Sequence, residues 1–185
     1  VNHDGGVSKI SLLQIQGAIQ KLNDDFGGVS GGVNAADTEI EFFLAKRDPD
    51  GNCTDGVTYT LGSDAPAWPT NKTQQPAYMN IHIKDLGGTG TLGYASLGAV
   101  QNGGGNIVIT YQWFRSTEEV ATQEVGHWFG LYHVFNGGCA GMTAATCASE
   151  GDRLCDTPPM KQSQFCSGQN SCSETPDLPD PIENF

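Results

Sequence analysis

Hydrophobic residues recur every three or four positions near the start of the chain, and this period predicts a helix from Ser11 to Phe26. Gly27 and Gly28 follow directly, and glycine is the residue that most often ends a helix. We therefore expect one face of this helix to pack on the core. The apolar stripe consists of Leu12, Ile15, Ile19, Leu22 and Phe26.

Apolar and polar positions alternate in two later segments, Glu39 to Leu44 and Tyr78 to Lys84, which predicts two half-buried strands. In the second segment Asn80 and His82 lie opposite the isoleucines, on the face that we expect to meet solvent. A third run, Asn106 to Phe114, is apolar along its length, as is typical of a strand buried on both faces.

A second helix is expected from about Ser116, with Ser116 or Thr117 as its N-cap. No periodic pattern remains beyond Gly137. The order of helix, strands, helix and coil predicts an α/β or α+β domain that continues into an irregular segment.

The second predicted helix carries a cluster of residues with metal-site spacing. Gln123 and His127 are one helical turn apart, so their side chains point the same way, and Glu124 lies beside them. Gly130 can adopt the positive φ that ends a helix, which would let His133 return toward the same point. Ligands on one turn, a further ligand after the break and a free carboxylate are the components of a hydrolytic zinc site.

Charge and cysteine content narrow the class of protein. With 21 acidic against 9 basic residues, the formal net charge of −12 opposes binding to nucleic acid or to an anionic membrane, so we expect neither partner. No run of apolar residues is long enough to span a membrane, and the first residues do not form a signal peptide. Five of the six cysteines lie between Cys139 and Cys172 without a CxxC pair, which favours disulfides and a secreted, extracellular protein.

The segment from Gln123 to His133 resembles the long zinc signature of the metzincin metallopeptidases, His-Glu-x-x-His-x-x-Gly-x-x-His. The sequence of this segment is similar to that of the pappalysin (cytophagalysin) family, peptidase family M43. The resemblance extends to Tyr78 to Tyr94 as an edge strand with its following loop, to Asn106 to Phe114 as an inner strand, and to Gly151 to Pro158 as an acidic loop.

The resemblance implies a metzincin-like catalytic domain over residues 1–185, with a twisted mixed sheet, an active-site helix and a backing helix. Residues 1–130 would form the N-terminal subdomain, and residues 131–185 would form part of a disulfide-tied C-terminal subdomain. It further implies a secreted, monomeric zinc endopeptidase that acts on peptides or proteins.

Roles for individual residues follow from the same resemblance. His127 and His133 match zinc ligands, Glu124 matches the general base that activates the zinc-bound water, and Gln123 occupies the first ligand position. The family's edge strand pairs with the extended substrate. The edge strand assigns substrate binding to Asn80, His82 and Lys84. Members of the family also bind calcium near the site, and the matching oxygen donors are Asp152, Asp156 and Thr157.

Two departures from the family pattern affect the expected activity. Gln123 offers a weak amide oxygen where an imidazole nitrogen belongs, so zinc affinity and turnover should be reduced. The final residues, Asp180 to Phe185, resemble the approach to the family's Met-turn, and Val1 to His3 resemble the tail of its first strand, so we expect both ends to be trimmed.

The lost ligand keeps other functions open. The chain could be a pseudo-peptidase that uses the peptide cleft as a binding module, or a structural part of a larger secreted protein. His82 is a weak substitute for the missing ligand, because a lone histidine is more often a surface or packing residue.

Overall fold

The structure is a computed structural model, and its backbone divides after Gly130 into two units, Val1–Gly130 and Leu131–Phe185. It describes residues 2–3, 10–30, 35–59, 68–69, 78–88, 90–102, 104–141, 143–161, 170–173 and 178–181. Cys166 and residues 182–185, on which the expected approach to the Met-turn depends, lie outside the described residues. Each unit is described by itself below.

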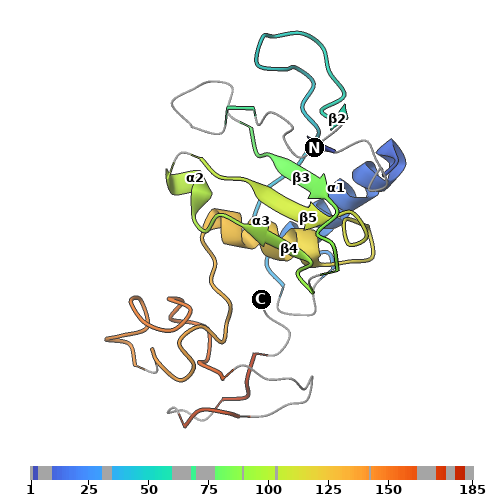
Figure 1. The fold of residues 1–185 in the computed structure, drawn as a ribbon. Coiled ribbons are helices and arrows are strands. Elements are labelled where there is room, and N and C mark those ends of the chain that lie inside the picture. Colours follow the sequence, from blue (N-terminus) through green and yellow to red (C-terminus); the bar gives the residue numbers. More distant parts are fainter. Residues whose placement is uncertain are drawn as a thin grey trace. The chain divides into compact units, whose positions relative to one another are not determined.

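A mixed, five-stranded sheet forms the framework of the first unit (Figure 1). Its strands in spatial order are β2 (Thr58–Tyr59), β1 (Asn2–His3), β3 (Ile81–Lys84), β5 (Ile107–Thr110) and β4 (Gly93–Ala95). Neighbouring strands are parallel except for β4, which runs antiparallel to β5. All four residues of β5 are buried, as its continuous apolar sequence predicts.

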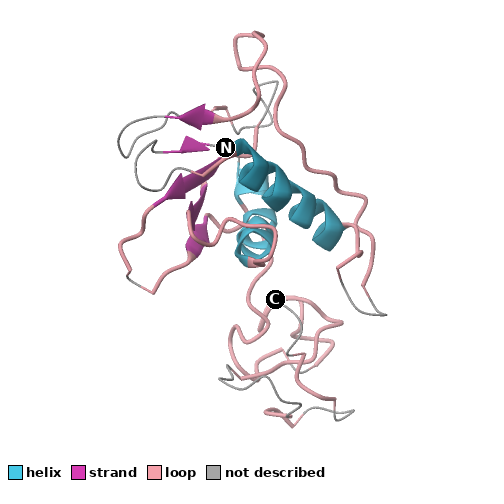
Figure 2. Cartoon of the chain, turned by 90° about the vertical axis from the view of Figure 1, so that its right-hand side faces the viewer, coloured by secondary structure: helices cyan, strands magenta, loops and turns pink. Residues whose placement is uncertain are grey.

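Two helices, α1 (Leu12–Phe26) and α3 (Val120–Phe129), pack on the same face of this sheet (Figure 2). A short helix, α2 (Ala99–Asn102), lies between β4 and β5 in the chain. The predicted stripe of α1 is confirmed from Ile15 onward, since Ile15 and Leu22 are fully buried in one cluster with isoleucines of β3 and β5. Its first member is wrong, because Leu12 is exposed at the start of the helix. In the part of the chain that the structure describes, no helix is long and apolar enough to cross a membrane.

The start of α1 is fixed by a capping box. The Gln14 N–H donates to Oγ of Ser11 at 3.2 Å, and the Ser11 N–H donates to Oε1 of Gln14 at 2.9 Å. The two residues thus satisfy backbone donors that the first turn of a helix leaves without intrahelical partners.

The predicted strand from Glu39 to Leu44 is wrong. Exposure alternates along it, but no described strand pairs with it. The side chain of Asn23 on α1 forms hydrogen bonds with the backbone of Phe42 instead. It accepts from the Phe42 N–H at 2.6 Å and donates to the Phe42 carbonyl at 2.9 Å. A side chain thus takes the place of a neighbouring strand.

The predicted start of the second helix at Ser116 is also wrong, because α3 begins at Val120 with Glu119 as an N-cap that makes no side-chain capping bond. Ser116 and Thr117 instead lie in an exposed turn, in which the Glu118 N–H donates to the Arg115 carbonyl at 3.3 Å. The turn delays the start of the helix by one helical turn.

A polar clamp joins α1 to α3. Asp25 on α1 accepts hydrogen bonds from Nζ of Lys21 and from Oγ1 of Thr122 on α3. Burial alone would raise the pKa of Asp25, but the hydrogen bonds from Lys21, Thr122 and Ser30 outweigh burial and lower that pKa below its ordinary value. The clamp holds α3 at Thr122, the residue directly before Gln123.

We expect Asp25→Asn to lower the free energy of unfolding by about 1 kcal/mol at pH 7. Because the pKa of Asp25 is lower in the folded state, its contribution is complete above the ordinary aspartate pKa and is lost as the pH falls through the lowered value. Urea unfolding at pH 7 and at pH 3 should therefore show a difference that shrinks in acid. Asp50→Asn, in an exposed turn, is the control. A difference independent of pH would contradict the role of the clamp.

The second unit is held by disulfides and turns, since no helix or strand occurs among its described residues. The disulfides join Cys139 to Cys172 and Cys147 to Cys155, which confirms the prediction of a disulfide-tied coil. Of the described cysteines, only Cys53 in the first unit is free.

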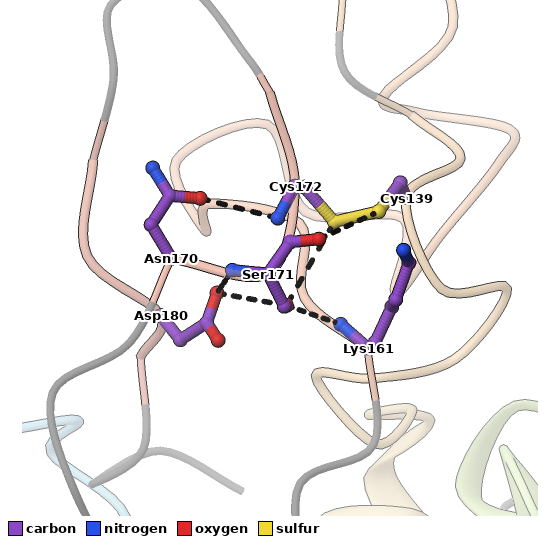
Figure 3. Close-up of a disulfide and its surroundings, with 6 residues drawn as sticks. All are labelled: Cys139, Lys161, Asn170, Ser171, Cys172 and Asp180. Carbon is purple, nitrogen blue, oxygen red and sulfur yellow. Dashed lines mark hydrogen bonds between the residues drawn. A yellow bond between two sulfur atoms is a disulfide. The ribbon is translucent and has the colours of Figure 1, made fainter.

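A buried carboxylate supports the first of these disulfides (Figure 3). Asp180 accepts from the backbone N–H of Ser171 at 3.0 Å and from the Ser171 hydroxyl at 3.1 Å. The Ser171 hydroxyl in turn accepts from the Lys161 N–H at 2.8 Å. Asp180 thereby joins three segments that no sheet or helix would hold together.

Candidate active site and metal centre

Helix α3 presents three of the predicted site residues. Gln123 and His127 are half-buried, whereas Glu124 is buried. Gly130 ends the helix with a left-handed φ of 110°, and its N–H donates to the carbonyls of Gly126 and His127. The glycine therefore ends the helix as the sequence predicts. The chain then passes into the second unit, which begins at Leu131.

Glu124 is buried without full hydrogen bonding. Its side chain is only 6% exposed, and Oε2 has no hydrogen-bond partner among the described residues. Burial raises the pKa of Glu124, and the nearby His127 opposes this shift. A carboxyl group with an open acceptor beside an imidazole can take a proton from a water molecule.

The prediction that Tyr78 to Lys84 forms the edge strand is wrong. Strand β3 pairs with β1 on one side and with β5 on the other, so it lies inside the sheet. The strand at the edge next to β5 is β4, and it lies over Glu124. A Cβ placed on Gly93 would be only 3.0 Å from Cγ and 3.2 Å from Oε1 of Glu124.

The three residues predicted to bind substrate take other positions on and beside β3. The Asn80 amide accepts from the Trp68 N–H and donates to the Trp68 carbonyl, both at 2.9 Å. His82 is only 6% exposed, so its predicted solvent exposure is wrong. Burial lowers the pKa of His82, against a hydrogen bond with Asn106 that raises it. Lys84, at the end of β3, is half-buried and pairs in register with Thr110. Asn80 thus anchors a loop, and His82 is a packed residue.

Hydrogen bonds to β5 determine which backbone groups of β4 remain at the outer edge. The Thr110 N–H donates to the Leu92 carbonyl at 2.8 Å, and the Ser96 N–H donates to the Asn106 carbonyl at 3.3 Å. In an antiparallel ladder the residues between such pairs direct their N–H and C=O groups to the opposite side. Gly93 and Ala95 therefore present their backbone groups to the outer edge of the sheet.

The remaining predicted ligands lie in the second unit. His133 is half-buried, and its ring stacks on Phe135 with centroids 4.7 Å apart and planes 12° from parallel. Its carbonyl accepts from the Asn136 N–H at 2.8 Å. The Asn136 side chain donates to the Gly151 carbonyl at 2.8 Å and so ties this turn to the acidic loop.

The acidic loop holds the predicted calcium ligands at different depths. Asp152 is buried, and its Oδ2 has no hydrogen-bond partner among the described residues, whereas Oδ1 accepts from the Leu154 N–H at 3.0 Å. Asp156 is exposed and Thr157 is half-buried. Among the described residues of this loop, only Asp152 has a buried carboxylate oxygen without a hydrogen-bond partner.

The donor set on α3 fits a zinc site that lacks one strong ligand. His127 supplies an imidazole and Gln123 supplies a neutral amide oxygen. Glu124 lies beside them as the candidate base, with a carboxylate oxygen that has no described partner. Within the described ranges, no group of three or more His, Cys, Asp or Glu side chains could hold a metal ion. Gln123 falls outside those residue types. Its neutral amide oxygen is a weaker zinc ligand than the imidazole nitrogen of a histidine.

A twisted mixed sheet, two helices on one face and this motif on the second helix define an α+β domain of the metzincin metallopeptidase type. The family model for peptidase M43, described as pregnancy-associated plasma protein-A, matches residues 64–176. The chain therefore belongs to peptidase family M43, a family of zinc metallopeptidases.

Curated relatives from fungi carry names that agree with this class. An extracellular metalloprotease of Neurospora crassa is 46% identical over 67 residues, and one of Colletotrichum graminicola is 47% identical over 66 residues. Each match covers 35% of this chain and 20% of the relative. The chain thus matches about a fifth of the length of these relatives.

Solved structures extend the similarity over nearly the whole chain. Mature mirolysin of Tannerella forsythia in complex with a cleaved peptide is 28% identical, with a TM-score of 0.69. The match covers 96% of this chain and 78% of that one. Mirolysin in complex with a compound gives a TM-score of 0.72 at 28% identity and covers 96% of this chain and 79% of that one.

Proposed function

We propose that the chain is the catalytic part of a secreted zinc-dependent endopeptidase whose activity is reduced by Gln123. The observation that carries the proposal is Glu124, a buried carboxyl group beside His127 with an oxygen that has no described partner. Secretion is supported by the two disulfides and by relatives named as extracellular.

The residues on α3 divide the chemistry between binding and proton transfer. His127 and Gln123 would hold zinc, with His133 as the third ligand assigned by the sequence motif. When bound, zinc polarises the scissile carbonyl and acidifies a water molecule. Glu124 would take a proton from the water molecule as the water oxygen bonds to the scissile carbon, and it would deliver that proton to the amine nitrogen as the C–N bond breaks. This role suits a carboxyl group whose pKa burial has raised.

The substrate would bind along β4 and not along β3. An extended peptide that adds to this edge would pair with the outward backbone groups of Gly93 and Ala95, and it would lie beside Glu124. This assignment replaces the proposed role of Asn80, His82 and Lys84 in substrate binding.

The pairing with β4 predicts an alternating response to backbone methylation of a peptide substrate. N-methylation should weaken binding by about tenfold or more at every second residue, because each lost hydrogen bond leaves a backbone partner unsatisfied. Methylation at the intervening residues, whose N–H groups point away from the sheet, should change binding by less than about twofold. Inhibition constants for a singly methylated series measure the pattern. A uniform loss along the peptide would contradict strand addition.

Calcium is the second metal of the proposal. Asp152 is its best-supported ligand, because one of its buried carboxylate oxygens has no partner among the described residues. Asp156 and Thr157 complete the proposed set in the same loop.

We propose that the domain acts as a monomer on peptide or protein substrates.

Loss of catalysis is the alternative, and the observation that favours it is the amide of Gln123 at a ligand position. In that case the chain would be a pseudo-peptidase that binds peptides at β4. Equilibrium dialysis against zinc, together with peptide cleavage by the same sample, separates the two functions. About one equivalent of zinc with turnover supports the peptidase. Peptide binding without zinc or turnover would support the pseudo-peptidase.

A further inference from the structure

Gly93 on the edge strand β4 lies against the side chain of Glu124. A Cβ at this position would lie 3.0 Å from Cγ and 3.2 Å from Oε1 of Glu124. It would also lie 3.0 Å from the carbonyl oxygen of Val108 on β5. Contacts this short are tighter than most contacts of side-chain carbons, so a methyl group at position 93 fits only if its neighbours shift by a few tenths of an ångström.

The absence of a side chain at Gly93 has two separable consequences. Toward β5, it relieves contact with the Val108 carbonyl within the ladder. Toward α3, it lets β4 lie against the Glu124 side chain and exclude water from one side of the carboxyl group. The second consequence accounts for part of the burial of Glu124, which is only 6% exposed.

We propose that Gly93 is a positioning residue for Glu124: its missing side chain lets β4 pack on the carboxyl group and fixes the place of Oε1. This inference rests on the proposed role of Glu124 in catalysis. The backbone of Gly93 would then face the substrate at the outer edge, while its Cα limits the movement of the general base. A larger residue would displace that base by a few tenths of an ångström without touching Gln123 or His127.

A double-mutant cycle on the metal-free chain tests the contact without any reference to activity. All three tryptophans, Trp68, Trp113 and Trp128, lie in the first unit, so tryptophan fluorescence reports the unfolding of that unit in urea. Gly93→Ala should destabilise the wild-type chain more than it destabilises Glu124→Ala. The factor by which Gly93→Ala raises the unfolding equilibrium constant should be about threefold or more larger in the wild-type background than in the Glu124→Ala background.

The strain against Val108 is present in both backgrounds and cancels in the cycle. Gly17→Ala serves as a matched control. A Cβ at Gly17 on α1 would make only an ordinary contact of 3.4 Å, with Ser116 in the turn before α3. It should show the same effect with and without Glu124. An equal effect of Gly93→Ala in both backgrounds would overturn the proposed contact.

Kinetics distinguish positioning of Glu124 from a general structural role. Gly93→Ala should lower kcat by about tenfold or more while bound zinc changes by less than about twofold, because small displacements of a catalytic group impair the chemical step. A parallel loss of zinc and kcat, or an unchanged kcat, would overturn the inference. A wild-type chain with neither zinc nor turnover would refute the proposed function, whereas the cycle would still test the contact.

Discussion

Gln123→His is expected to bind zinc at least about 100-fold more tightly than the wild-type chain, and to raise turnover at limiting zinc. The physical reason is the exchange of a neutral amide oxygen for an imidazole nitrogen at a ligand position. Loss of an outer partner of a zinc ligand already costs about 10- to 100-fold in affinity or activity, so restoring a direct ligand should have a larger effect. Competition titration with a chromophoric chelator measures the affinity.

A matched control separates this site from the general affinity of histidine for zinc. Gln16→His adds one imidazole on the exposed side of α1 and should leave the zinc affinity unchanged. If Gln123→His gains neither metal nor turnover, then the lost ligand is not the defect that limits this chain.

Glu124→Gln should lower turnover by at least about 100-fold while leaving bound zinc unchanged. The amide keeps the shape of the side chain under β4 but cannot accept and pass on the proton of a water molecule. Zinc analysis and kcat for the same preparation measure both halves of the prediction.

Glu119→Gln is the matched control for that substitution. Glu119 is the N-cap of the same helix, its side chain is 86% exposed, and it lies 4.0 Å from the ammonium group of Lys21. Its loss should leave turnover within about twofold of wild type. A Glu124→Gln variant that retained turnover would exclude Glu124 as the general base.

The features that local sequence determines were predictable. The stripe around Ile15 and Leu22 specifies the buried face of α1, and the apolar run at β5 specifies a buried strand. Gly130 ends α3 where the motif requires a break. Each of these signals depends on side chains that lie close together in the chain, so no knowledge of the sheet order is needed.

The position of the edge strand could not be read in the same way. Alternation shows that a segment has two faces, but it does not specify the neighbours of a strand. Strand β4 is only three residues long and begins with Gly93, so it carries almost no alternating signal. Its glycine-rich surroundings are typical of a loop, although Gly93 is the residue through which β4 approaches Glu124.

Other errors arose where a distant side chain replaced local structure. Asn23 bonds the backbone of Phe42 and removes the need for a neighbouring strand there. His82 lies inside the sheet, where its alternating position predicted solvent. Both depend on contacts between segments far apart in the sequence. The late start of α3 has a local cause, because Ser116 and Thr117 lie in a turn that precedes the helix.

Zinc-dependent cleavage by the wild-type chain is the most direct measurement of the central claim. A mixed peptide library should be incubated with three samples of the protein. The first contains added zinc, the second has had its metal removed with a chelator, and the third has had zinc restored after that removal. We predict slow cleavage that chelation stops and zinc restores, and that Gln123→His accelerates. Peptide binding without cleavage in any of these samples, Gln123→His included, would contradict the assignment of this chain as a peptidase.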